Sequence, residues 1–77
     1  MNKAWRVARA RYDAAANAVA EKRVASFDTA GECLTYVNAN SEEPLMGYHR
    51  DCMLLDAPAM AYVKTDAYRA EYSKVVD

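Results

Sequence analysis

Residues 2–24 read NKAWRVARARYDAAANAVAEKRV, and the interpretation of this stretch decides the expected fold. The stretch contains neither glycine nor proline, and alanine, the residue with the highest intrinsic helix propensity, occupies nearly every second or third position. At about 100° per residue, Trp5, Tyr12 and Val19 fall on one stripe with small alanines between them. We therefore predict one long helix over residues 2–24, with an alanine seam that lets a second helix approach closely.

A second helix is expected to begin at Thr29. Thr29 and Glu32 have the spacing of a capping box, in which each side chain satisfies a free backbone N–H of the other residue. The polar run at residues 38–41 ends this helix, because asparagine and serine side chains compete for backbone hydrogen bonds.

Two further helices are expected after it. Pro44 suits the first turn of a third helix, which ends or kinks near Asp56 because Pro58 follows. A fourth helix is expected from about residue 58 to residue 75. The predicted fold class is therefore all-α, a single helical domain over residues 1–77 built as a compact bundle of three to four helices with a long alanine-rich N-terminal helix.

The composition predicts that one chain has a small core. There are sixteen alanines and six tyrosines but only four leucines and no isoleucine. Each CH₂ removed from water contributes only about 0.8 kcal/mol, so alanine stabilises a core weakly. In a chain of 77 residues a single core rarely supplies more than about 3–5 kcal/mol. We therefore expect a homodimer.

The charge is distributed unevenly along the chain. Residues 1–23 carry a net charge of +4, and residues 24–56 carry −5. On the predicted first helix, the basic side chains of residues 3–11 point in different directions around the axis and form no single stripe for a phosphate backbone. Nucleic acid is therefore a disfavoured partner. The acidic segment, or an external acidic partner, suits these cations better.

The sequence predicts a cytoplasmic location without a membrane partner. No apolar run approaches the roughly 18 residues that span a bilayer, and the first 13 residues carry a charge at nearly every turn. The two cysteines are too few for a disulfide scaffold, so we expect both to be reduced.

Few residues suit catalysis or metal binding. His49 is the sole histidine and lies three residues before Cys52. With Cys33 and either Asp51 or Asp56, these residues fall short of the paired spacings that make a zinc motif specific. A Cys–His nucleophile pair would need an orienting carboxylate and an oxyanion site, and neither is identifiable. We expect no catalytic residues, no metal and no cofactor, and a protein that is not an enzyme.

The favoured function is that of a small helical protein that binds another protein, of the regulator or inhibitor type that phages and other mobile elements also carry. Tyrosine, methionine and arginine are enriched at interfaces. The expected partner-binding residues are Met46, Tyr48, Arg50, Tyr62, Tyr68, Arg69 and Tyr72. The alternative is a small dimeric DNA-associated regulator.

Overall fold

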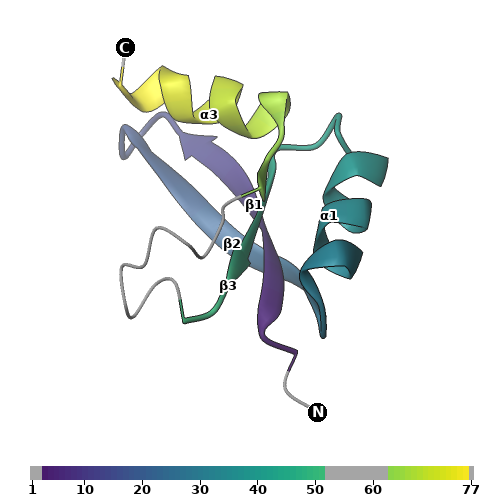
Figure 1. Cartoon of the computed structure of the whole chain (residues 1–77). Coiled ribbons are helices and arrows are strands. Elements are labelled where there is room, and N and C mark those ends of the chain that lie inside the picture. The colour runs from purple at the N-terminus through teal and green to yellow at the C-terminus, as the bar shows by residue number, and fades with distance from the viewer. Residues whose placement is uncertain (1–2, 52–62, 77) are drawn as a thin grey trace.

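The described part of the chain forms an antiparallel sheet of four strands with two helices, so the expected all-α bundle is wrong (Figure 1). The computed structural model describes residues 3–51 and 63–76. In chain order the elements are β1 (Trp5–Asp13), β2 (Ala18–Phe27), α1 (Ala30–Ala39), β3 (Leu45–His49), β4 (Val63–Lys64) and α3 (Asp66–Val76). The strand order across the sheet is β2-β1-β3-β4, which places β1 inside the sheet and β2 at one edge.

Residues 2–24, predicted to be one helix, contain β1, a turn and most of β2. Asp13 Oδ1 accepts hydrogen bonds from the backbone N–H groups of Ala15 and Ala16 at 3.0 and 3.4 Å, and Asn17 has a left-handed φ of 50°. Aspartate and asparagine are among the residues that stabilise such a turn. The turn folds β2 back on β1, so the predicted alanine seam is divided between two strands and an exposed turn.

Pairing on both sides of β1 overrides the helix propensity of its alanines. Trp5 lies opposite Phe27 in β2 and opposite His49 in β3. The helical advantage of alanine over ordinary residues is at most about 0.7 kcal/mol per residue, which two ladders of backbone hydrogen bonds outweigh. Ala8 and Ala10 are both buried, because larger side chains pack over them; we call these two small residues the alanine floor of β1.

The two helices lie on opposite faces of the sheet (Figure 1). Leu45 and Met46 are neighbours in β3, and successive residues of a strand point to opposite faces. Leu45 packs in a cluster of buried residues with Val7 and with two residues of α1, Cys33 and Val37. Met46 packs in a second cluster with Ala10 of β1 and Tyr68 of α3. Within the described residues, the core therefore consists of two small clusters, one on each face.

The predicted second helix is confirmed as α1. The backbone N–H of Glu32 donates to Thr29 Oγ1 at 3.2 Å, which is the expected N-cap contact. Asn40 is the C-cap, inside the polar run that was expected to end the helix. Cys33 and Val37 are the buried residues of α1 and face the sheet.

The predicted third helix is wrong in its first part, because Leu45–His49 is strand β3. A Cβ atom on Gly47 would lie 2.7 Å from Cys33 Sγ, so glycine at this position allows α1 to approach the sheet. The predicted fourth helix is confirmed from Asp66 onward as α3. The end of the predicted third helix and the start of the predicted fourth helix fall on residues 52–62, which lie outside the described residues.

Candidate functional site

Two tyrosine rings and a lysine lie together at α3. The rings of Tyr68 and Tyr72 are stacked, with centroids 6.5 Å apart and an angle of 11° between their planes. Lys64 Nζ lies 5.4 Å from the first centroid and 5.8 Å from the second, within the range of a cation–π interaction. With Arg69 and Ser73 these residues line a hollow of about 290 Å³, and we call the five residues the α3 surface.

Thr65 attaches the start of α3 to β3. Its Oγ1 accepts hydrogen bonds from the backbone N–H groups of Leu45 and Tyr68, both at 3.1 Å. The Thr65 N–H donates to the carbonyl of Leu45 at 3.0 Å. Thr65 is buried, so these bonds replace water on polar groups that the fold removes from solvent. The first turn of the helix is therefore held rigidly against the sheet.

Tyr68 is the base of the α3 surface. Its ring is 3% exposed and packs in one cluster with Met46 and Ala10. Its hydroxyl group donates a hydrogen bond to the Glu21 carboxylate of β2. The buried Tyr68 ring thereby provides a fixed platform for the stacked Tyr72 ring.

Glu71 attaches the middle of α3 to the β1–β2 hairpin. The pairing of β1 with β3 ends at Arg9, so β3 offers no partner for the backbone N–H of Tyr12. This N–H donates instead to Glu71 Oε2 at 3.2 Å. Lys74 Nζ donates to Glu71 Oε1 at 2.8 Å. The hydrogen bond from Lys74, followed by that from the Tyr12 backbone, lowers the pKa of Glu71 below its usual value.

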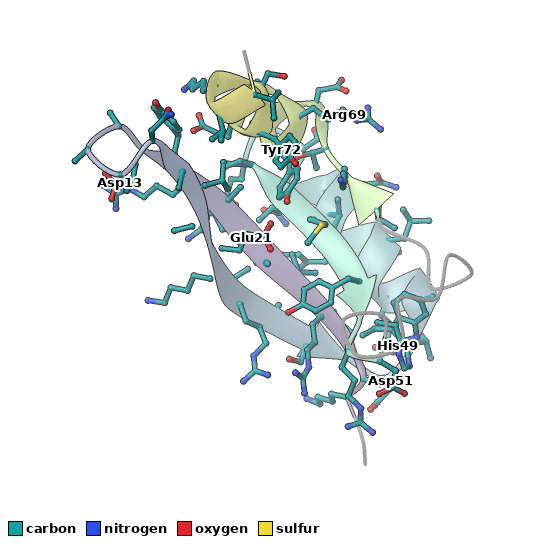
Figure 2. All side chains as sticks on the ribbon, turned by 90° about the vertical axis from the view of Figure 1, so that its left-hand side faces the viewer. Asp13, Glu21, His49, Asp51, Arg69 and Tyr72 are labelled. Carbon is teal, nitrogen blue, oxygen red and sulfur yellow. The ribbon has the colours of Figure 1, made fainter. Side chains whose placement is uncertain are left out.

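Four of the five residues of the α3 surface are exposed, namely Lys64, Arg69, Tyr72 and Ser73, and Figure 2 labels Arg69 and Tyr72. Tyr72 is 48% exposed although it is a large aromatic residue. Arg69 Nη1 lies 3.1 Å from Asp66 Oδ1, and both side chains are exposed. The surface therefore presents one exposed aromatic ring that is stacked on a buried ring and has the Lys64 ammonium group near it.

The structure brings together three of the seven predicted partner-binding residues, Tyr68, Arg69 and Tyr72. Lys64 was not among the predicted residues. It belongs to the short strand β4, which no pattern in the sequence had indicated. A cation four residues before the first of the paired tyrosines was the available signal.

The other predicted residues lie elsewhere. Met46 is 4% exposed and is a core residue, because it faces Tyr68 and the alanine floor of β1. Tyr48 and Arg50 lie at and after the far end of β3, and both are half-buried. Tyr62 lies outside the described residues.

The side chain of His49 makes contacts within the fold. Its Nδ1 accepts a hydrogen bond from the backbone N–H of Asp51 at 3.1 Å, and its ring meets Trp5 edge-on at 5.1 Å. Burial raises the pKa of the Cys33 thiol, which disfavours the thiolate. No group of three or more histidine, cysteine or acidic residues is placed to hold a metal ion within residues 3–51 and 63–76. Cys52 lies outside these ranges.

A second hollow, of about 640 Å³, lies beside α1. The rings of Phe27 and Tyr36, 5.4 Å apart, form part of its lining. Its polar groups are engaged within the helix, because Thr35 Oγ1 donates to the Gly31 carbonyl and Asn40 Nδ2 donates to the Tyr36 carbonyl. This hollow therefore offers apolar contact but few free polar groups that would orient a ligand.

Comparisons with protein-family models, with curated proteins and with solved structures each find no match. In the described part of the chain, neither helix has the length and apolar character that crossing a membrane requires.

Proposed function

We propose that this protein acts without catalysis, by binding another protein through the α3 surface. The observation that carries the proposal is the stack of Tyr72 on the buried Tyr68, with Lys64 Nζ within 6 Å of both ring centroids. A large aromatic side chain that is half exposed and already fixed in position loses little conformational entropy on binding. Tyrosine and arginine are also the residue types that most often contribute the largest share of binding energy at interfaces.

The hollow of about 290 Å³ suits a side chain of a protein partner. A drug-sized ligand commonly occupies a deeper site of roughly 300–1,000 Å³ that encloses most of its surface. Lys64, Arg69 and Tyr72 border the hollow, so a partner side chain seated there would contact an aromatic residue and cationic residues together. The proposed site is therefore an interface anchor of the regulator or inhibitor type.

The experiment is an affinity capture from the native host, followed by titration with the captured protein. Tyr72→Ala should weaken the captured interaction about tenfold or more, because hot-spot truncations cost roughly 2 kcal/mol or more. Leu34→Ala is the matched control, since Leu34 is an exposed large apolar residue on α1. Tyr68 is not a suitable target, because it is buried and its truncation would destabilise the fold.

Tyr72→Phe separates the contribution of the ring from that of the hydroxyl group. Retention of binding in this variant, with loss in Tyr72→Ala, supports stacking as the source of affinity. Equal capture by the wild type and by Tyr72→Ala would contradict the proposal.

The homodimer and the cytoplasmic location remain part of the proposal. The alanine seam no longer supports a dimer, because its residues are divided between two strands and a turn, so the expected homodimer rests on the small core alone. Light scattering after size exclusion measures the oligomeric state. The buried thiol of Cys33, free in the structure, suits a reducing compartment.

A further inference from the structure

Five cations of the N-terminal region lie on the paired strands β1 and β2. On the predicted helix these side chains would point in all directions around the axis, but residues 5–13 and 18–27 are strands, so this reason for disfavouring a nucleic acid no longer holds. Strands β1 and β2 carry five cations, which we call the basic band: Arg6, Arg9, Arg11, Lys22 and Arg23. The same strands carry two carboxylates, Asp13 and Glu21.

The strand register places the basic band around the free edge of the sheet. Arg9 lies directly opposite Lys22, and both point to the α1 face, because Arg9 also lies opposite Leu45. Arg23 lies opposite Ala8, so it points to the α3 face together with Arg6. Cations on both faces of the sheet therefore lie along the free edge. The stretch of β1 that carries its three arginines is roughly 15–20 Å long, at about 3.4 Å per residue.

Most of the band has no charged partner. Arg9 pairs with Glu43 at 2.8 Å, and the other four cations make no ion pair with any residue that the structure describes. Arg6 Nε is buried and has no hydrogen-bond partner among the residues that the structure describes. By contrast, Arg69 and Lys74 of α3 each lie beside a carboxylate three residues away.

Protection of the sheet edge accounts for only part of this arrangement. Charged residues on an edge strand prevent pairing with other chains, and a β-bulge near Val24 adds to that protection. This role explains Lys22 and Arg23 on β2. It does not explain the arginines of β1, which is an inner strand. Placing Arg9 opposite Lys22 also costs stability through like-charge repulsion.

We infer that the basic band binds the phosphate backbone of a nucleic acid. Arginine and lysine supply the hydrogen bonds and the charge that phosphates require, and such contacts fix a protein on a nucleic acid without reading its sequence. With five cations and two carboxylates, the two strands carry a net charge of +3, so this edge is positive although the whole chain carries −1. The band is separate from the α3 surface, and this inference is independent of the proposed function.

The test measures fluorescence anisotropy of labelled 20-nucleotide oligonucleotides of mixed sequence, single-stranded and duplex, across a series of salt concentrations. Four or five phosphate contacts predict that log Kd changes with log salt concentration with a slope of about 4. Lys22→Gln with Arg23→Gln should weaken binding about tenfold and reduce that slope by about 2.

The matched control is Arg69→Gln with Lys74→Gln, which removes the same charge from α3. This control should change affinity less than about twofold, since it removes no proposed phosphate contact. Circular dichroism of both double variants checks that the fold is retained.

Three results would overturn the inference. The first is no binding by the wild type at low salt, and the second is an equal loss in the two double variants, which would reflect net charge alone. The third is displacement of the oligonucleotide by polyglutamate as effectively as by unlabelled oligonucleotide, which would indicate an acidic protein as the partner. Tyr72→Ala should leave oligonucleotide binding unchanged, so failure of either proposal is visible separately.

Discussion

The two helices of this protein are attached to the sheet by different chemistry. On one face, α1 is held by four fully or almost fully buried side chains, Val7, Cys33, Val37 and Leu45. On the other face, α3 is held largely by polar contacts: Thr65 on β3, the Tyr68 hydroxyl on Glu21, and Glu71 on the Tyr12 N–H.

This difference shows how a chain with few large aliphatic residues divides its tasks. Among the described residues, the fully buried aliphatic side chains gather on the α1 face, where they exclude water and stabilise the sheet. The α3 face has an alanine floor and polar anchors, which position the tyrosines without enclosing them. The face that stabilises the fold and the face proposed for binding are therefore separate.

The largest expected effect is on the free energy of unfolding, and it differs between two neighbouring residues of β3 that face opposite sides of the sheet. Leu45→Ala should lower the free energy of unfolding by about 2–5 kcal/mol, because it empties the α1 cluster. Met46→Ala should cost less, since its cluster is built on alanine and tyrosine and the methionine side chain is adaptable. Urea denaturation of both variants measures the difference. A larger loss for Met46→Ala would show that the α3 face is the main core.

On the α1 face, Gly47 lies where helix α1 approaches the sheet closely. Gly47→Ala should cost about 1–3 kcal/mol, because the new Cβ would lie 2.7 Å from Cys33 Sγ. The same change in a Cys33→Ala background should cost less, since the sulfur atom that it meets is gone. A double-mutant cycle by chemical denaturation gives the coupling, expected to be about 0.5 kcal/mol or more. Strict additivity would mean that the helix does not approach the sheet at this point.

The smallest expected effect is on the α3 face and depends on pH. The pKa of Glu71 is lowered in the folded state, so its contribution to stability is present above the pKa of the unfolded chain and is lost as pH falls through the folded pKa. Glu71→Gln should therefore melt below the wild type at neutral pH, and the two melting temperatures should converge in acid. Glu42→Gln, at an exposed residue, is the control. A melting difference that persists unchanged in acid would show that the Glu71 charge is not the cause.

Helix α1 was predictable because its determinants are local. The Thr29 and Glu32 side chains form their capping contacts within one turn, and Asn40 ends the helix with its own side chain. The α3 tyrosines were predictable in part for the same reason, because Tyr68 and Tyr72 are one helical turn apart.

The hairpin was missed because local propensity and long-range pairing disagree there. The run of alanines favours a helix, whereas β1 is a strand because β3 pairs with it, with Trp5 opposite His49, 44 residues later in the chain. The turn signal, Asp13 followed by Asn17, was present in the sequence. The basic band was missed for the same reason, since its geometry exists only once β1 and β2 are paired.

By itself, the sequence determined a small core, an uneven charge distribution, the capped helix α1 and a tyrosine-bearing C-terminal helix, because composition and short-range hydrogen bonds set these properties. Tertiary structure alone decided that the alanine-rich segment is a hairpin, that Met46 is a core residue while Tyr72 is exposed, and that five cations border one edge. Strand pairing joins residues far apart in the chain, and its free energy exceeds the small conformational preferences of single residues.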